Sequence, residues 1–355
     1  MKGYHHHAYA VRVPSGSPLA GDFRWLKLRE PRSDVLWYDM RRFRSEERLL
    51  QALDGRVPRI PRVSRLPVGA GWMTFTGFIE GTTLDRVPGP VGRVAERFMD
   101  QIEELFRALA AVDRPPLPRD GALEWGCAEP ADCPDPADSA GSSAFLRGLV
   151  HYSVEHAYAA ELVSLRDLLG ELGMDADTLR DFGRRLPRLT DRRPQLLHAD
   201  LHRKNLVVDR SGGLWTIDWE LALFGDPLYD LATHLHLMAY RPDQEEEMIL
   251  RWKRAVGAEA SLGADEDLPL YRTYKRLQSV YTDIVRGAAR LREEGGERRL
   301  RGTAALAHKA MTVAKESLGI EKVPPLPAME AAFSAWCASH PGPASRATAD
   351  TPQIG

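Results

Sequence analysis

The stretch that decides the fold runs from residue 196 to residue 231 and reads LLHADLHRKNLVVDRSGGLWTIDWELALFGDPLYDL. It contains two short apolar runs, residues 206–209 and 214–217, separated by the turn Arg210-Ser211-Gly212-Gly213. Both runs are typical of β-strands, and adjacent glycines suit a tight turn between antiparallel neighbours. The sequence therefore predicts a β-hairpin in the middle of this stretch.

Three polar residues surround the base of this hairpin. If Asp209 pairs with Leu214, the register places Asn205 directly opposite Asp218. Asp200 lies five residues before Asn205, in the loop that leads to the same point. Carboxylate and amide oxygens are ligands that Mg²⁺ prefers, and a further carboxylate can act as a general base. The hairpin base is therefore a candidate magnesium site beside an acid–base group.

Length and charge limit the classes of protein to consider. A chain of 355 residues can form two lobes with a large core, and 43% of its residues are apolar. The net charge of −2, from 48 basic and 50 acidic residues, creates no field that attracts nucleic acid or anionic lipid. No run is apolar enough to span a bilayer or to form a signal peptide, and three cysteines suit a reducing compartment. We expect a cytoplasmic monomer or homodimer without nucleic-acid or membrane partners.

A basic residue occupies an unusual place near the N-terminus. Residues 7–13 and 23–29 flank a turn-rich segment and predict another hairpin. Side chains alternate along a strand, so Phe23, Trp25 and Lys27 are expected on one face. Lys27 therefore stands where the pattern favours an apolar side chain. The alternative is an edge-strand lysine in solvent.

The next element offers a partner for Lys27. Residues 38–53 have a helical periodicity that places Glu46 on the apolar stripe and Glu47 towards solvent. A buried carboxylate needs a cation to offset its desolvation, and Lys27 is the nearest candidate in the predicted topology. We therefore predict a Lys27–Glu46 ion pair, which either stabilises the fold or positions a phosphate group.

The pattern changes from strands to helices near residue 75. An apolar strand at residues 72–75 precedes a glycine-containing passage, which predicts a hinge at about residues 75–81. Residues 1–77 are expected to form a small β-rich lobe with one helix, and residues 78–339 a larger, mostly helical lobe. Residues 340–355 are rich in Pro, Ser, Ala and Thr and predict a disordered tail.

One helix of the larger lobe is a candidate substrate wall. Residues 269–291 carry Tyr271, Lys275 and Asp283, a mixture that suits a pocket for a ring-containing substrate. The alternative is that this helix only packs on the core. The full set of helices predicted after the hinge is 91–109, 143–172, 175–185, 244–256, 269–291, 303–318 and 328–339.

Three segments resemble those of one known family. Residues 198–205, His-Ala-Asp-Leu-His-Arg-Lys-Asn, resemble the H-x-D-x-x-x-x-N catalytic loop of kinases in the form found in aminoglycoside phosphotransferases. Residues 217–220 resemble that family's metal-binding segment, and residues 225–232 resemble the segment that usually follows it. The resemblance covers roughly residues 5–290 and implies an α+β, bilobal protein-kinase-like fold.

The resemblance implies a phosphoryl transfer, which depends on positioning and charge neutralisation. Asp200 would orient a substrate hydroxyl or accept its proton. Asn205 and Asp218 would hold Mg²⁺ against the nucleotide phosphates, and Lys27, held by Glu46, would contact the same phosphates.

The same resemblance implies supporting roles for other residues. His202 would donate a hydrogen bond to the transferred phosphoryl group. His198 and Asp230 would hold the loop through structural hydrogen bonds. The hinge would bind the purine largely through backbone groups, so ATP and GTP stay open as donors. Its residues are Thr76, Gly77, Phe78 and Ile79.

The implied function is a phosphotransferase acting on a hydroxyl of a small molecule. The leading acceptor is an antibiotic of the aminoglycoside, nucleoside or macrolide type, whose inactivation gives resistance. Asp226 and Asp283 would help to form an acidic pocket for an aminoglycoside. Kinases of choline, homoserine or sugars share the loop and are one alternative. A non-catalytic nucleotide-binding protein is the other, because only Met1-Lys2-Gly3-Tyr4 stand where kinases have a glycine-rich phosphate loop.

Overall fold

A computed structural model describes residues 6–31, 43, 45–68, 71–90, 92–113 and 141–341. The chain folds into two compact units, each made of two segments. The first unit contains Met1–Phe145 and Leu189–Leu268, and the second contains Leu146–Arg188 and Pro269–Gly355. The expected lobes at 1–77 and 78–339 stay a prediction. Most of the expected tail at 340–355 lies outside the described residues.

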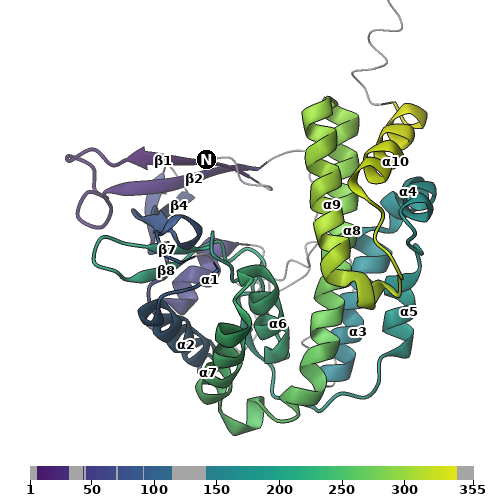
Figure 1. Ribbon diagram of the computed structural model, residues 1–355. Coiled ribbons are helices and arrows are strands. Elements are labelled where there is room, and N and C mark those ends of the chain that lie inside the picture. The colour runs from purple at the N-terminus through teal and green to yellow at the C-terminus, as the bar shows by residue number, and fades with distance from the viewer. Residues whose placement is uncertain are drawn as a thin grey trace, which may run out of the picture. The chain divides into compact units, whose positions relative to one another are not determined.

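A four-stranded antiparallel sheet opens the first unit (Figure 1). Its strand order is β1-β2-β4-β3, and the first pair forms the predicted N-terminal hairpin. Strand β3 was not expected, because Pro67 falls within it; β3 lies at the sheet edge, where a missing N–H is tolerated. The elements are β1 (His6–Arg12), β2 (Trp25–Pro31), β3 (Val63–Val68), β4 (Gly71–Gly77) and the helix α1 (Glu46–Leu53).

The two faces of β2 differ from the prediction in one respect. Phe23 precedes the strand, which begins at Trp25, so strand alternation does not apply to it. Phe23 instead packs in a small core with Leu26, whose side chain lies on the face opposite to Lys27. The expected common face of Phe23 and Lys27 is therefore wrong, and Lys27 does not replace a core residue.

The second predicted hairpin is present with a register shifted by one residue. Strands β7 (Leu206–Val208) and β8 (Leu214–Thr216) pair with Val208 opposite Leu214. Asp209 belongs to the turn, so extending the pairing places Asn205 opposite Ile217 and not opposite Asp218. Strand β5 (Thr82–Thr83) adds to this sheet, and β6 (Gln195–Leu197) pairs separately with β9 (Leu223–Gly225).

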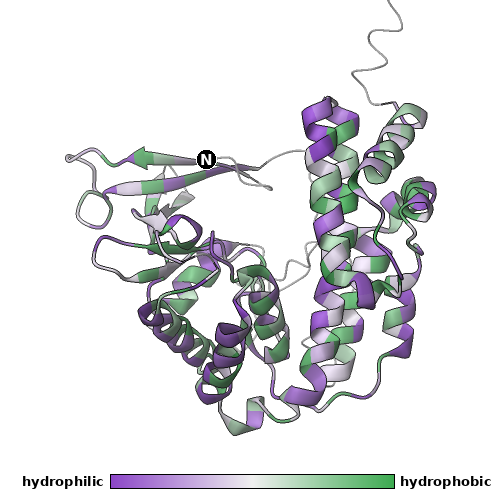
Figure 2. Ribbon diagram, viewed as in Figure 1, coloured by the Kyte–Doolittle hydropathy of each residue, from purple (hydrophilic) through white to green (hydrophobic). Residues whose placement is uncertain are grey.

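The helices of the first unit differ in how they are buried. Helix α2 (Glu96–Ala110) has an apolar and a polar side, visible as green and purple in Figure 2. Helix α6 (Pro227–Met238) is buried on nearly all sides, in agreement with its largely apolar sequence. Asp226 caps its N-terminus by accepting the N–H of Leu228. The remaining helices are the 3₁₀ turn η1 (Leu84–Arg86) and α7 (Pro242–Ala260).

The second unit is helical. The predicted helix at 143–172 is interrupted: α3 (Ser142–Tyr152), which starts in the first unit, continues as a π-helical turn at Ser153–Ala157 before α4 begins. Helices α8 and α9 lie side by side (Figure 1), with Gly287 facing Thr303. The other helices are α4 (Ala159–Glu171), α5 (Thr178–Arg185), α8 (Ala264–Glu294), which also starts in the first unit, α9 (Glu297–Leu318) and α10 (Leu326–Ser339).

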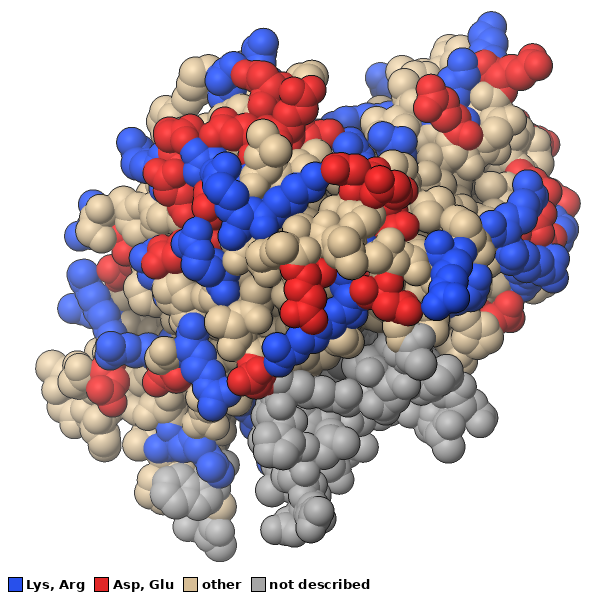
Figure 3. Space-filling model, turned by 90° about the horizontal axis from the view of Figure 1, so that it is seen from below, with Lys and Arg blue, Asp and Glu red and all other residues tan. Residues whose placement is uncertain are grey.

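Two surface properties follow the composition. Within the described part of the chain, no helix is both long and apolar enough to cross a membrane. Basic and acidic side chains lie next to one another on the face drawn in Figure 3. This mixing of signs agrees with the small net charge of −2.

Candidate active site

The loop at 198–205 is fixed to the unit by a buried carboxylate. Asp230, on α6, is 2% exposed and accepts two backbone N–H groups, from His198 at 3.1 Å and from Ala199 at 2.8 Å. Ala199 has a φ of 63°, in the left-handed region. The paired hydrogen bonds to Asp230 hold the backbone in this conformation, so the chain turns sharply just before Asp200.

His198 holds the same loop from its other side. Its Nε2 lies 3.1 Å from the carbonyl oxygen of Ile217, and its Nδ1 accepts the N–H of Asp200 at 3.3 Å. A carbonyl can only accept, so Nε2 carries the proton and the ring is neutral. Complete burial lowers the pKa of His198 and keeps it neutral. The histidine therefore connects the loop to the end of the β7–β8 hairpin.

The side chains of Asn205 and His202 both reach Asp200. Asn205 Nδ2 donates to both the backbone oxygen and Oδ2 of Asp200, each at 2.9 Å. His202 Nε2 lies 3.5 Å from the same Oδ2. The N–H of Lys204 donates to His202 Nδ1 at 3.1 Å, so the ring proton of a neutral His202 sits on Nε2, towards Asp200. Asp200 is thus held by donors while 30% of its side chain stays exposed to solvent.

Asp218 lies one position beyond the residue paired with Asn205. The N–H of Ile217 donates to the backbone oxygen of Asn205 at 2.9 Å. Asp218 then takes a φ of 68°, a left-handed conformation that aspartate tolerates better than most residues. The one-residue register shift and this turn together replace the direct pairing expected from the sequence.

Asn205 and Asp218 suit a magnesium ion. Among the described residues, the Asp218 carboxylate has no hydrogen-bond or ion-pair partner and Asn205 Oδ1 accepts no donor, because the Asn205 amide nitrogen is directed at Asp200. Mg²⁺ is commonly bound by one or two carboxylates together with phosphates and water. Oxygen donors in this arrangement therefore fit a metal held partly by the protein and partly by a ligand.

The predicted Lys27–Glu46 pair is wrong, and Arg29 takes the place of Lys27. Glu46 is 4% exposed, forms an ion pair with Arg29 and accepts the N–H of Trp219 at 3.0 Å. Arg29 also bonds Glu47 at 2.6 Å, so Glu47 does not simply face solvent as expected. Burial alone lowers the pKa of Arg29, but the two carboxylates raise it above its usual value. Within the described ranges, Lys27 has no ion-pair partner.

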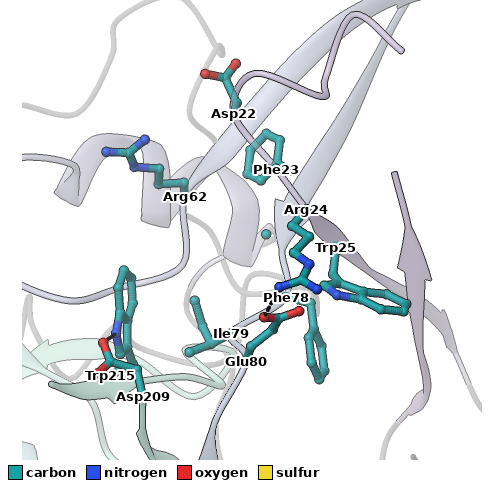
Figure 4. A pocket seen from close by; sticks show the side chains of 11 residues that line it. Asp22, Phe23, Arg24, Trp25, Arg62, Phe78, Ile79, Glu80, Asp209 and Trp215 are labelled. Atoms are coloured by element: carbon teal, nitrogen blue, oxygen red, sulfur yellow. Dashed lines mark hydrogen bonds and ion pairs between the residues drawn. The ribbon is translucent and has the colours of Figure 1, made fainter. Parts of the chain in front are cut away.

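The expected purine-binding hinge borders a pocket. Thr76 pairs with Lys27, whereas Gly77 pairs with Leu26. A Cβ on Gly77 would lie 3.0 Å from the Phe23 ring, so Gly77 faces the small core that contains Phe23 and Leu26. The adjoining pocket of about 330 Å³ (Figure 4) is lined by Asp22, Phe23, Arg24, Trp25, Arg62, Gly77, Phe78, Ile79, Glu80, Asp209 and Trp215.

No residue of the loop at 198–205 lines this pocket, nor do Lys27 and Asp218. Two polar contacts join residues of its lining: the Arg24–Glu80 ion pair at 3.4 Å and the hydrogen bond from the Trp215 indole N–H to Asp209 at 2.7 Å (Figure 4). Its lining includes Gly77, Phe78 and Ile79 of the expected hinge, and Trp25, which has the same strand parity as Lys27. The pocket therefore adjoins the expected purine-binding hinge but does not include the loop at 198–205.

Three of the four expected substrate residues have structural surroundings instead. Asp226 is 2% exposed and forms an ion pair with Arg192 at 3.0 Å, so its charge is already compensated. Tyr271 is completely buried, and the Nζ of the buried Lys275 bonds Gln278 on the same helix at 2.6 Å. These placements correct the expectation of an open aromatic and acidic wall and favour its alternative, packing on the core.

Asp283 also departs from an acidic pocket. It is half-buried, and burial raises the pKa of its carboxyl, while three basic residues oppose this shift. These residues are Arg286, Arg290 and Lys309. A carboxylate surrounded by cations attracts an aminoglycoside less than an isolated one.

Two groups near the site were missed from the sequence. Arg29 has the same strand parity as Lys27, so parity alone could have identified it as a second candidate. The imidazole of His234 bonds the carbonyl of Leu201, next to Asp200. No local pattern identifies His234, because α6 is apolar on nearly every side.

The fold and the loop together define a protein-kinase-like phosphotransferase architecture, as expected. A family model described as the phosphotransferase enzyme family, APH, matches residues 2–274. The chain therefore belongs to this family of kinase-type phosphotransferases. A search of curated proteins returned no match.

The chain is similar to several solved structures, one of which reaches a TM-score of 0.50. Aminoglycoside phosphotransferase APH(4)-Ia is 17% identical, covers 91% of this chain and 92% of its own, and has a TM-score of 0.50. Macrolide 2'-phosphotransferase type I is 18% identical over 86% of this chain and 88% of its own, with a TM-score of 0.46. A Plasmodium vivax ethanolamine kinase is 15% identical over 89% and 80%, with a TM-score of 0.47. At these identities the similarity concerns the fold alone.

Proposed function

We propose that the protein transfers the terminal phosphoryl group of ATP or GTP to a hydroxyl of a small molecule. The observation that carries this proposal is the arrangement around Asp200. Its Oδ2 accepts from Asn205 at 2.9 Å, while Asp218 and the Asn205 amide oxygen are left for a cation. A general base beside a magnesium site is what phosphoryl transfer to an alcohol requires.

In this proposal the residues of the loop and Asp218 divide base catalysis from metal binding. Asp200 orients the acceptor hydroxyl and takes its proton, and the Asn205 hydrogen bond keeps the carboxylate facing the acceptor. Asn205 Oδ1 and Asp218 hold Mg²⁺, which when bound neutralises charge on the nucleotide phosphates. His202 Nε2 lies 3.5 Å from Oδ2 of Asp200, and its N–H would turn from that oxygen to the transferred group when the nucleotide is bound.

The two roles expected of Lys27, pairing with Glu46 and contacting the phosphates, fall to two different cations. Arg29 holds Glu46 and Glu47, which ties β2 to α1. Lys27 is left to contact the phosphates, since it shares the inner face of β2 with Arg29 and has no ion pair among the described residues. The expected purine site at Thr76–Ile79 belongs to the same proposal.

The preferred acceptor is an antibiotic, whose phosphorylation would give resistance. Membership of a family that includes aminoglycoside phosphotransferases supports this choice. A choline-, homoserine- or sugar-type metabolite is the alternative. We expect the protein to act in the cytoplasm as a monomer or homodimer, without nucleic-acid or membrane partners.

The proposal is tested by phosphorylation of a panel of aminoglycosides, macrolides, nucleoside antibiotics and hydroxylated metabolites. Mass spectrometry detects the added phosphoryl group with ATP or GTP as donor and Mg²⁺ present. Asp200→Ala and Asp218→Asn should both abolish acceptor phosphorylation while leaving the melting temperature close to that of the wild type. A product carrying phosphate on a carboxylate or amine would contradict the hydroxyl acceptor.

The rival function is nucleotide binding without catalysis. It predicts that nucleotide binds with the same affinity to wild type and to Asp200→Ala, and that no compound in the panel is phosphorylated. Wild-type-like turnover in Asp218→Asn would instead show that the metal is held elsewhere. If the assigned oxygen donors hold the ion, chelation by EDTA should stop turnover, and addition of excess Mg²⁺ should restore it.

A further inference from the structure

Helix α6 contacts the catalytic loop through a single line of residues. Asp230 accepts the two N–H groups that precede Asp200 in the chain. His234, four residues later, lies 2.9 Å from the backbone oxygen of Leu201. Met238, four residues later again, accepts from Arg203 Nε at 3.0 Å. Residues spaced by four lie on one face of a helix, so one stripe of α6 supports the whole loop.

The middle contact has a defined direction. Leu201 offers a carbonyl oxygen, which can only accept, so His234 Nδ1 must carry a proton and donate it. His234 is completely buried, with its ring packed edge-on against Phe106 at 5.4 Å. Burial lowers the pKa of His234 to about 4, which leaves one proton on the ring near neutral pH. That proton is the one on Nδ1.

Tyr240 selects this tautomer. Its hydroxyl lies 2.9 Å from His234 Nε2 and acts as the donor, because the neutral ring has only a lone pair on that nitrogen. Tyr240 is 8% exposed, and burial raises the pKa of its hydroxyl, so it keeps its proton. Ala239, at a φ of 48°, ends α6 and turns the chain so that Tyr240 returns beneath the helix.

On each side of Asp200, the peptide group one residue beyond its own peptide bonds is thus fixed to one helix. The N–H of Ala199 is held by Asp230 at 2.8 Å, and the carbonyl of Leu201 is held by His234 at 2.9 Å. Anchors on either side determine the direction in which the Asp200 side chain leaves the backbone. A neutral imidazole does this without placing a positive charge near the carboxylate, which would weaken it as a base.

We infer that His234 is a positioning residue for Asp200, with its tautomer set by Tyr240. This inference rests on the proposed function for its effect on turnover, but the hydrogen bond itself is independent of that function. The Tyr240–His234–Leu201 chain touches neither nucleotide nor acceptor. Its role is to hold the base at the geometry that transfer requires, where displacements on the order of 1 Å cost about 100-fold in rate.

Four variants separate positioning from general stability. In His234→Leu the donor is lost, whereas in His234→Asn the side-chain N–H takes the place of Nδ1. Tyr240→Phe removes the group that selects the tautomer. Thr233→Val is the matched control, since Thr233 is equally buried on α6 and its hydroxyl has no hydrogen-bond partner among the described residues.

Turnover is measured with the acceptor found in the panel and with Mg·ATP or Mg·GTP. We expect kcat to fall about 10- to 100-fold in His234→Leu, while KM for the nucleotide stays within about twofold. His234→Asn should recover most of this loss, Tyr240→Phe should lie between, and Thr233→Val should match the wild type. A His234→Leu enzyme with wild-type kcat, or equal losses in His234→Leu and Thr233→Val, would overturn the inference.

A second measurement does not depend on turnover. In ¹⁵N NMR spectra of labelled full-length protein, His234 should be the Nδ1–H tautomer at pH 7 and shift to the Nε2–H tautomer or a mixture in Tyr240→Phe. A wild-type Nε2–H tautomer overturns the positioning role even if the enzyme is active. An Nδ1–H tautomer in a protein that phosphorylates nothing means that the proposed function fails while the hydrogen bond to the loop stands.

Discussion

At the scale of single residues, the cation beside Glu46 determines how β2 is joined to the site. Arg29 and Lys27 point to the same face of the strand, yet Arg29 alone reaches Glu46 and Glu47. A guanidinium offers five N–H groups in one plane and can bond two carboxylates together, whereas an ammonium is a compact point charge. Because Glu46 also accepts the N–H of Trp219, Arg29 influences the residue that follows Asp218.

Replacing each cation by alanine should separate their roles. Arg29→Ala leaves Glu46 buried without its counter-ion and should lower the free energy of unfolding by about 3 kcal/mol. Lys27→Ala, two residues away on the same strand, should change stability by less than about 0.5 kcal/mol but raise KM for the nucleotide about tenfold. Urea unfolding and steady-state kinetics give the two values. The opposite pattern would restore Lys27 as the partner of Glu46.

Buried histidines should make the protein sensitive to acid. The pKa of His234 is about 4 in the folded protein against 6.5 for an ordinary histidine. Between these values the unfolded chain binds the extra proton and the folded protein does not, so stability rises with pH across this window. The contribution lost on going from pH 7 to pH 4 is on the order of 3 kcal/mol.

His234→Asn isolates this contribution. The difference in unfolding free energy between wild type and the variant should shrink from pH 7 towards pH 4 when measured by urea unfolding. His198, whose pKa is also lowered by burial, affects both proteins equally and cancels in the comparison. A difference that stays constant across the window would mean that His234 is protonated in the folded protein.

At the scale of elements, the β7–β8 turn determines which residues face each other in the site. The Asp209 carboxylate accepts the N–H groups of Ser211 and Gly213 at 2.8 Å each and the indole N–H of Trp215 at 2.7 Å. Burial opposes ionisation, but the hydrogen bond from the Ser211 hydroxyl at 2.7 Å, together with the indole and backbone N–H groups, lowers the pKa of Asp209 to about 2. Asp209 thereby belongs to the turn and not to the strand, which shifts the register by one residue.

Asp209→Ala should therefore affect the site from a distance. We expect a loss of about 1–2 kcal/mol in stability, as for removal of a capping carboxylate. Turnover should fall by a larger factor than that of Arg210→Ala, an exposed change in the same turn. If the two variants have equal kcat, the register does not depend on the Asp209 hydrogen bonds.

At the scale of the whole chain, a buried ion cluster joins distant segments of the first unit. Arg192 has no exposed side-chain surface and bonds Asp226 at 3.0 Å and Asp267 at 2.9 Å. Asp226 also caps α6, the helix that supports the loop at 198–205. The acid that sequence reasoning assigned to an aminoglycoside pocket therefore holds the supporting helix in place.

Asp226→Asn tests this assignment. Removing one carboxylate from a buried cation should lower the free energy of unfolding by about 3 kcal/mol, while KM for the acceptor stays within about twofold. Asp243→Asn is the control, because Asp243 pairs with Arg93 at the surface and should change stability by less than about 1 kcal/mol. If the variant has a raised KM for the acceptor and unchanged stability, Asp226 binds the substrate and does not serve the ion cluster.

Much of the architecture was predictable because it depends on neighbours in the chain. Alternation and turn residues located both hairpins, and helical periodicity located most helices. Strand β3 and helix α6 were missed for local reasons as well. Pro67 argued against a strand at β3, and α6 has no polar face that would give its sequence a helical periodicity. The break in the helix at 143–172 involves a π-turn, for which the sequence has no clear signal.

The sequence by itself determined the phosphotransferase loop, its spacing to the Asp218 segment and the burial of Glu46, since motif spacing and periodicity are properties of consecutive residues. Only the tertiary structure decided which cation meets Glu46, which residue faces Asn205 and which helix holds Asp200. Each of these choices is made between groups far apart in the chain, by distances of a few ångströms. A register shift of one residue changes which residue faces Asn205, and a move of two residues along β2 changes which cation meets Glu46. Neither change alters a local sequence pattern.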